Sequence, residues 1–581
     1  MLSSAGTSPG ERQLLGPQTT GRSYHNLSMP EYEIRGIYDV AIPMRDGIRL
    51  RADLYRPSAS GRFPALIAVS PYPRQGQYLG IPAGFLEAGQ TDFWVPRGYA
   101  HLIVNTRGTC GSEGTYPLFG EAERRDLYDM IEWAAEQPWC NGNVGMIGVS
   151  YFAIEQFYAA LERPPHLKAI FPWSSSLDIY REIAWHGGMF SGGFMGMMFN
   201  AIGMLSKRGG GFLRWPPFRA LNRILERPDV HRRFNTPPRD TLKVFNRVLR
   251  FSYDRHPWDD LFYEVAVEHP FYDEFWQARD LVDRVGEIQI PMYLGSDWEN
   301  VALHLHTPFL AVDHLTGEVP WRIGMVPRGG LQWPWESMHV EALAWYDHWL
   351  KGRDTGIMEG PPIRYFVEGA GEWRTAEEWP LPETRWTDLF LGLDGTISAQ
   401  EAREGYRDYL FLPPTVKRPR NTNPPPLPRV LAWDTRPLER AVDLVGPFVL
   451  HLEASSTATD TDWIVKLCDV APDGRVLDLT QGWLRASHRA VDEERSKPYH
   501  PYHPHDRFDP LTPGEPTSFE IEVLPTAHRF LPGHRMRLLL TSQDDGGFAM
   551  QGLSHYPLGQ SARNTVFSTS RLTVPLVGGA L

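Results

Sequence analysis

Short apolar runs alternate with amphipathic segments over roughly the first third of the chain. Strand-like runs lie at residues 34–40, 49–55, 65–69, 99–105, 144–147 and 167–171. Between them, Leu127, Met130, Ile131 and Ala134 recur at three- and four-residue spacing, which predicts a helix over residues 121–136. Strands that alternate with helices indicate a mostly parallel sheet covered on both faces. The pattern therefore predicts an α/β domain.

This alternation stops between residues 178 and 286. The stretch holds glycine pairs, many aromatic residues and helical patterns such as residues 238–251. We interpret it as a helical cap inserted over the sheet rather than as part of it. The strand pattern resumes at residues 288–294 and 321–326 and ends with a predicted helix over residues 340–350.

After residue 361 the chain changes to short alternating strands separated by turn clusters. These strand-like runs lie at residues 364–367, 448–454, 463–470, 518–524 and 536–540. The pattern is typical of an all-β sandwich. We therefore predict five segments: a flexible arm (1–33), an α/β core in two parts (34–177 and 287–360), the cap (178–286) and a C-terminal β-sandwich (361–581).

One motif in this pattern contains a candidate catalytic residue. The apolar run at residues 144–147 enters the tight turn Gly148-Val149-Ser150, and a helix-compatible stretch follows. A strand, a G-x-S turn and a helix form the context of a nucleophile elbow, which holds a serine hydroxyl out at the end of a sheet. Phe152 stands where such elbows usually have glycine. An ordinary strand–helix turn is the alternative interpretation of Ser150.

The amino-acid composition narrows the classes of protein to which the chain could belong. The 581 residues are 42% hydrophobic and 22% charged, which indicates several globular domains. A net charge of −12 without a Lys/Arg stripe argues against nucleic acid as a partner. No apolar run reaches the roughly 18 residues of a membrane helix. We expect a cytoplasmic protein that acts on a small molecule, with no cofactor and no metal; whether it forms a homodimer stays open.

Several further motifs occur together in one order along the chain. They include Val69-Ser70-Pro71-Tyr72 and residues 105–114, 139–151, 346–352, 460–463, 469–474, 484–489 and 530–534. On these residues the chain resembles the cocaine-esterase-like members of the X-Pro dipeptidyl-peptidase-like serine hydrolases. The resemblance implies an α/β-hydrolase core, an inserted helical cap and a C-terminal jelly-roll sandwich that helps to wall the active site.

The resemblance also assigns part of the site. It places the nucleophile on Ser150 and the oxyanion hole on the amide N–H of Tyr151 and the hydroxyl of Tyr72. Acyl transfer builds negative charge on a carbonyl oxygen, and each preorganised donor there contributes about 3–4 kcal/mol. For Tyr72 the alternative is a half-buried aromatic residue at the end of a strand.

The other two triad positions depart from the family pattern. The loop after residues 321–326 should hold the catalytic histidine, but its aligned position is Gln332, or less well Gly330. The loop that should hold the acid offers Asp297 or Glu299 beside Trp298. Glutamine cannot accept a proton, and losing one triad member costs on the order of 10⁴–10⁶ in rate.

Four histidines are candidate replacements for the missing base. They are His304, His306, His339 and His186. Each also has a structural interpretation, as a packing residue or a helix-terminal residue.

Aromatic residues gather in and near the cap, and this favours a flat, apolar substrate, although core packing explains much of the pattern. The candidate substrate-binding residues are Trp173, Trp185, His186, Phe190 and Phe152.

One weaker signal is given a structural interpretation. His503-Pro504-His505-Asp506 has the composition of a metal site, but Pro504 and the family pattern favour a structural loop.

Three functions remain open for the protein. The first is hydrolysis of an ester or amide by Ser150 with a relocated base. The second is a non-hydrolytic cyclase, lyase, isomerase or acyltransferase on the same scaffold. The third is a pseudo-enzyme that binds a small molecule.

Overall fold

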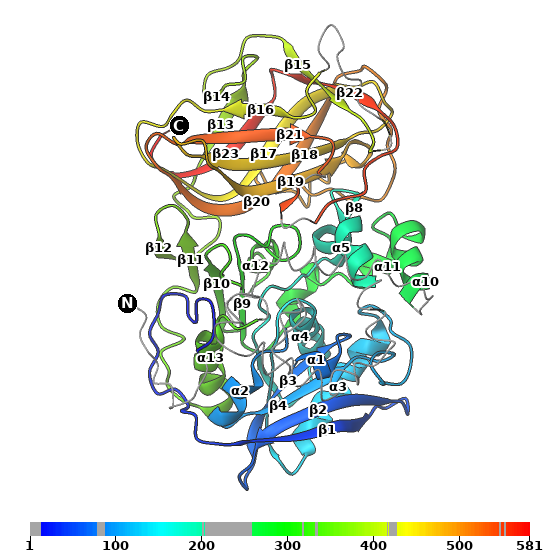
Figure 1. Ribbon diagram of the computed structural model, residues 1–581, viewed down its shortest axis with the longest axis vertical. Helices are drawn as coiled ribbons and strands as arrows, with labels where there is room; N and C mark the ends of the chain where they lie inside the picture. Colours follow the sequence, from blue (N-terminus) through cyan, green and yellow to red (C-terminus); the bar gives the residue numbers. More distant parts are fainter. Residues whose placement is uncertain are drawn as a thin grey trace.

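The structure is a computed structural model that describes residues 13–77, 87–199, 203, 258–315, 319–331, 335–414, 416, 427–544, 548–550 and 553–580. Two bodies are stacked along the long axis of the molecule, an α/β core and a β-rich domain (Figure 1). Each has its own apolar cluster of buried side chains. The predicted helix at 238–251 lies outside the described residues.

A ten-stranded sheet, counted within the described residues, forms the centre of the α/β core. In spatial order its strands are β1 (Ile34–Pro43), β2 (Arg49–Pro57), β4 (Ala100–Asn105), β3 (Phe63–Ser70), β5 (Cys140–Met146), β6 (Leu167–Ile170), β9 (Met292–Asp297), β10 (Trp321–Val326), β11 (Ile363–Val367) and β12 (Glu372–Ala376). Pairing is parallel from β4 through β11 and antiparallel at both edges. Because the sheet is covered, β3 and β4 are buried at every position.

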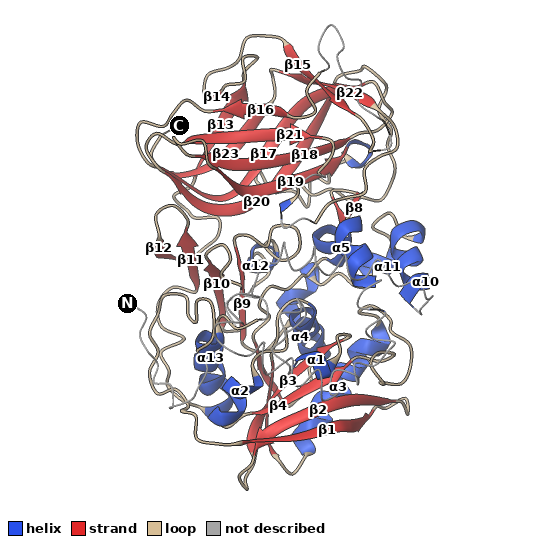
Figure 2. Cartoon of the chain, in the orientation of Figure 1, coloured by secondary structure: helices blue, strands red, loops and turns tan. Residues whose placement is uncertain are grey.

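Helices cover this sheet (Figure 2). The longer ones are α3 (Glu121–Glu136), α4 (Tyr151–Glu162) and α13 (His339–Lys351), and the short ones are α1 (Arg74–Gln77), α2 (Thr91–Trp94), η1 (Val95–Arg97) and α12 (Thr307–Val312). α3 packs against α4, whereas α13 packs on β5 and β6. None of the helices in the described ranges is long and apolar enough to cross a membrane.

The insertion between β6 and β9 consists of short elements where the structure describes it. They are the π-helix η2 (Tyr180–Ala184), the hairpin β7 (Trp185–His186) and β8 (Met189–Phe190), α5 (Gly192–Met197), α10 (Trp258–Tyr263), the π-helix η5 (Glu264–Glu268), α11 (Glu274–Gln277) and the 3₁₀ helix η6 (Val282–Glu287). In Figure 1 they lie beside the junction of the two bodies. They contribute only the small β7–β8 hairpin to a sheet, as an inserted cap should.

The C-terminal body is all β. Its described strands are β13 (Arg385–Leu391), β14 (Ile397–Ser398), β15 (Tyr406–Phe411), β16 (Leu431–Asp434), β17 (Val442–Ser456), β18 (Asp462–Val470), β19 (Val476–Arg485), β20 (Thr517–Phe530), β21 (Arg535–Thr541), β22 (Ala562–Phe567) and β23 (Arg571–Gly578), with the 3₁₀ helix η7 (Ala486–His488). They enclose a buried cluster that includes Phe448, Trp463 and Leu538. The predicted class, an α/β-hydrolase core with a C-terminal β-sandwich, is confirmed.

The boundary between the two bodies differs from the predicted one at residue 361. β11 pairs in parallel with β10, and β12 pairs with β11, so both strands extend the core sheet. The β-sandwich begins with β13. The reason is that a short alternating strand looks the same in sequence at the edge of a core sheet and in a sandwich, since its partner is not part of the pattern.

The N-terminal segment also differs from the predicted flexible arm, at least from residue 13 onward. The backbone N–H and the hydroxyl of Thr20 both donate to the Glu341 carboxylate, at 2.9 Å each. The hydroxyl of Ser28 donates to Asp347 at 2.7 Å. Both acceptors are buried residues of α13. The polar composition of this segment therefore reflects hydrogen bonds to buried carboxylates.

Candidate active site

Ser150 lies in a strained turn between β5 and α4. Its backbone dihedrals are φ 60° and ψ −122°, a conformation that non-glycine residues rarely adopt. The Ser150 N–H donates to the Ser174 carbonyl at 2.9 Å, and the Ser150 carbonyl accepts the N–H groups of Ala153 and Ile154 in the first turn of α4. These bonds hold the strained turn in place. The geometry is that of the nucleophile elbow predicted from sequence.

The glycine at position 148 is required by this turn. Gly148 has φ 125°, and a Cβ there would lie 2.4 Å from the Cβ of Phe152 and 3.1 Å from the Glu87 carbonyl oxygen. Phe152 is fully buried, and its ring meets the ring of Tyr72 edge-on at 5.9 Å between centroids. Phe152 thus packs against both the elbow and the ring of Tyr72.

An imidazole lies within hydrogen-bond reach of Ser150. The Nε2 atom of His304 is 3.2 Å from Ser150 Oγ. Its Nδ1 atom is 3.0 Å from the carbonyl oxygen of Ser175. Since a carbonyl oxygen only accepts, Nδ1 carries the proton and Nε2 is left to accept from the serine hydroxyl. Burial lowers the pKa of His304 to about 4, so the ring is neutral at pH 7.

The loop that carries His304 is fixed by Asp297, the acid expected to orient the base. Asp297 Oδ1 accepts the N–H groups of Glu299 and Asn300 at 3.1 and 2.9 Å. Oδ2 accepts the Leu331 N–H at 3.1 Å. Burial raises the pKa of Asp297 to about 7. Within the described residues, Asp297 therefore caps its own loop and makes no hydrogen bond to an imidazole.

A different carboxyl group is connected to His304 indirectly. Thr307 Oγ1 is 2.7 Å from the Ser175 carbonyl oxygen and 2.7 Å from Glu182 Oε1. The Ser175 oxygen is the same atom that accepts from His304. Burial raises the pKa of Glu182 to about 7. Among the described residues, no carboxylate bonds His304 directly, and Glu182 is connected to the ring only through Thr307 and this carbonyl.

Two hydrogen-bond donors flank the serine. The Tyr72 hydroxyl forms a hydrogen bond with Ser150, and burial keeps the pKa of Tyr72 well above its usual value, so the hydroxyl stays protonated. Tyr151, the first residue of α4, follows Ser150 directly. The Tyr151 ring packs edge-on against Tyr72 at 5.9 Å between centroids, and its hydroxyl donates to Glu123 at 2.8 Å. Ser150, His304, Tyr72 and Tyr151 therefore form one cluster.

Comparison with known proteins gives the family of the chain. Residues 46–324 match the family model of the X-Pro dipeptidyl-peptidase (S15 family), and residues 355–565 match that of the X-Pro dipeptidyl-peptidase C-terminal non-catalytic domain. The chain is 30% identical to a cocaine esterase of Rhodococcus over 562 residues, which cover 88% of this chain and 92% of the relative. The chain belongs to the cocaine esterase and X-Pro dipeptidyl-peptidase family. It is a serine hydrolase-like enzyme of the ester or amide class.

Another relative and two solved structures extend the likeness. A putative serine esterase of Mycobacterium bovis is 27% identical over 602 residues, covering 90% of this chain and 92% of that one. A CocE/NonD family hydrolase from Staphylococcus aureus superposes with a TM-score of 0.72 at 24% identity, covering 94% of both chains. An α-amino acid ester hydrolase gives 0.65 at 20% identity, covering 98% and 100%. The solved structures agree in fold.

Of the four candidate bases, only His304 lies beside Ser150 in this family member. Both ring nitrogens of His186 and of His339 make hydrogen bonds elsewhere in the protein. His306 points toward the C-terminal body, where its Nε2 lies 3.2 Å from Glu522. Gln332, the residue aligned with the family's histidine, lies outside the described residues.

The aromatic residues expected to bind substrate lie in different parts of the structure, some in the core and some in the cap. Trp173 is fully buried in the core, where its ring lies on Gly295 and Gly324, so its surroundings differ from those of a pocket residue. Trp185 and Phe190 pack against each other in the cap at 4.9 Å between centroids. Their aromatic character was the only signal in the sequence, and it does not distinguish core packing from a pocket wall.

Proposed function

We propose that this enzyme hydrolyses a carboxylic ester or amide of a small apolar or aromatic molecule, with Ser150 as nucleophile and His304 as general base. The observation that carries the proposal is the 3.2 Å separation between His304 Nε2 and Ser150 Oγ. That distance suits proton transfer along a hydrogen bond. The proposed base replaces the histidine that the sequence lacks at position 332.

In this mechanism Ser150 Oγ attacks the substrate carbonyl carbon while its proton passes to His304 Nε2. The negative charge on the carbonyl oxygen is held by the Tyr72 hydroxyl and the Tyr151 N–H. His304 then gives the proton to the leaving alcohol or amine, and an acyl-Ser150 ester remains. A water molecule, deprotonated by His304, attacks this ester and releases the carboxylic acid and the free serine.

The charged state of His304 is supported more weakly than in a Ser-His-Asp triad. There a buried carboxylate stabilises the imidazolium that forms during attack. Here Nδ1 donates to a neutral carbonyl at 3.0 Å, and Glu182 is connected only through Thr307. A base of lower pKa takes the proton less readily. We therefore expect slow turnover of simple esters.

The proposal predicts that a fluorophosphonate probe labels the wild-type enzyme once, on Ser150. The elbow places Oγ 3.2 Å from His304 Nε2, which can accept its proton as phosphorus is attacked. Intact-protein mass spectrometry and peptide mapping measure the label. Ser150→Ala should remain unlabelled, whereas Ser398→Ala, a change in the edge strand β14, should label as the wild type does. An unlabelled wild-type enzyme that still hydrolyses aryl esters would contradict this mechanism.

The acid limb of the pH profile supplies a second prediction. The pKa of His304 is lowered to about 4 by burial. Below that pH the ring is protonated and cannot accept from Ser150; above it the ring is neutral and competent. The kcat/KM for an uncharged aryl ester should therefore rise through about pH 4 and stay level across neutral pH. An acid limb centred near the ordinary histidine value of about 6.5 would assign the base to another group.

A non-hydrolytic acyltransferase is the second candidate. It is favoured by the absence of a carboxylate partner on His304 among the described residues, which weakens activation of water more than capture of a bound, more nucleophilic acceptor. Product analysis separates the two reactions. Turnover of an aryl ester with a primary amine or alcohol present gives mainly the acid if the enzyme is a hydrolase, and mainly the acyl-transfer product if it is a transferase.

A further inference from the structure

A polar cavity of about 440 Å³ lies at the junction of the two bodies. Its wall combines residues of the cap, the loop and helix after β9, and the C-terminal body, and it includes neither Ser150 nor His304. Among the described residues, six carboxyl groups and three Lys or Arg side chains line it. That excess of acidic groups favours a cation over an anion as its occupant.

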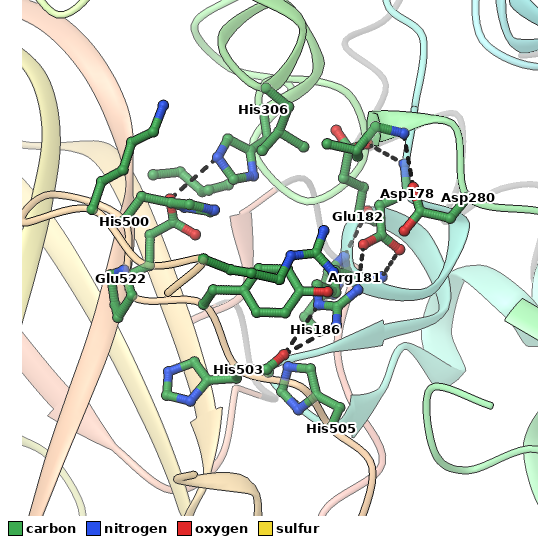
Figure 3. A pocket seen from close by; sticks show the side chains of 18 of the residues that line it. Asp178, Arg181, Glu182, His186, Asp280, His306, His500, His503, His505 and Glu522 are labelled. Carbon is green, nitrogen blue, oxygen red and sulfur yellow. Dashed lines mark hydrogen bonds and ion pairs between the residues drawn. The ribbon is translucent and has the colours of Figure 1, made fainter. Parts of the chain in front are cut away.

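Three ligand-type side chains meet at one end of this cavity. His306 Nε2 lies 3.2 Å and His500 Nδ1 lies 2.7 Å from the same atom, Oε1 of Glu522. The ligand atoms of all three residues lie within 4.8 Å of one another. Figure 3 shows the three side chains together on one side of the pocket, away from Asp178, Glu182 and Asp280. All three are half-buried, with 15 to 23% of each side chain exposed.

The geometry points to a divalent metal site of the Zn²⁺ type formed by His306, His500 and Glu522. Imidazole nitrogens and a carboxylate oxygen are the ligands of tetrahedral zinc at about 2.0–2.2 Å, which separates neighbouring ligand atoms by roughly 3.3 Å. The 3.2 Å contact is already close to this separation, and the 2.7 Å contact must lengthen by about 0.6 Å. The metal takes the position of the N–H protons that now face Oε1.

The origin of the ligands gives this site two consequences. His306 belongs to the core, at the N-terminal end of α12, whereas Glu522 lies on β20 and His500 lies in the loop before it. A bound ion therefore ties the β-sandwich to the core. Three protein ligands leave a fourth position of tetrahedral Zn²⁺ for water or a ligand, as in catalytic zinc sites, and here that position adjoins the cavity.

The sequence does not reveal this set. The ligands are separated by 194 residues between His306 and His500 and belong to two domains, and their spacing matches no local zinc motif. The compact motif that resembles a metal site, His503-Pro504-His505, is used differently. Both ring nitrogens of His503 bond backbone carbonyls at 2.9 Å, which fits the structural role expected for that loop.

The test uses tag-free, chelator-stripped full-length protein titrated with ZnCl₂ and, separately, with CoCl₂. We expect one Zn²⁺ per chain by competition with a chromophoric chelator, and a visible d–d spectrum of tetrahedral type with Co²⁺. His500→Ala and Glu522→Gln should each weaken Zn²⁺ binding by at least about tenfold. They should also abolish the rise in Tm that Zn²⁺ gives the wild type, because only the folded protein presents the joined ligands.

Matched controls come from the same cavity wall. His314→Ala and Asp283→Asn remove a histidine and a carboxylate that line the cavity outside the cluster, and should bind Zn²⁺ as the wild type does. If Glu522→Gln fails to fold, His500→Ala, at a more exposed position, decides the question alone. Failure of the wild type to bind one Zn²⁺, or equal binding by His500→Ala, overturns the proposal. Neither outcome bears on Ser150 chemistry.

Discussion

Replacing His304 with glutamine should lower kcat/KM for a simple aryl ester by about 10⁴-fold. Glutamine is similar in size and can still form a hydrogen bond with Ser150, but it cannot take the proton. The His304 ring lies 3.2 Å from Oγ and donates to the Ser175 carbonyl. Among the described residues, the other candidate bases, His186, His306 and His339, bond elsewhere. Initial rates with a chromogenic ester, measured across pH 5 to 9, give the effect.

Two comparisons make this result specific. Ser150→Ala should cost about as much as His304→Gln, and the double variant little more, because residues that act as a unit are strongly non-additive. His314→Gln, a change in the wall of the cavity between the two bodies, should retain wild-type rates. A His304→Gln enzyme that keeps more than about a tenth of the activity would show that the base is elsewhere, with the loop around Gln332 as the first place to look.

Much of the core could be predicted because its signals are local. The helix at residues 121–136 and the strand at 321–326 have the predicted bounds, since hydrophobic spacing alone identifies them. The join between core and sandwich was not local. β11 and β12 have the same alternating pattern as sandwich strands, and only their pairing with β10 assigns them to the core. Likewise, residues 13–33 are polar because their partners are the buried carboxylates of α13.

The candidate site divides in the same way. Ser150 and Tyr72 lie in motifs that can be recognised in the sequence, because an elbow and a strand-end tyrosine need particular neighbours. His304 carries none and was one of four alternatives. It is two residues from His306, yet the two rings point to different sites, since the turn before α12 has no regular periodicity. The pair Thr307 and Glu182 is 125 residues apart in sequence, and no pattern in the chain connects them.

Replacing Tyr72 with phenylalanine should reduce kcat by about 10²–10³-fold and change KM little. One donor to a developing oxyanion contributes about 3–4 kcal/mol, and it does so in the transition state rather than in the bound ester. The ring should stay in place, because its edge-on contacts with Tyr151 and Phe152, both at 5.9 Å, do not involve the hydroxyl. Steady-state kinetics on one aryl ester separates kcat from KM.

Tyr116→Phe is the matched control for this variant. Tyr116 is also a buried tyrosine of the same cluster, but its hydroxyl bonds the Tyr151 hydroxyl at 3.0 Å instead of Ser150. Its loss should lower Tm by as much as Tyr72→Phe does while leaving kcat within a few-fold of wild type. If Tyr72→Phe raises KM without lowering kcat, the hydroxyl only positions substrate, and the charge on the carbonyl oxygen is stabilised by the Tyr151 N–H without it.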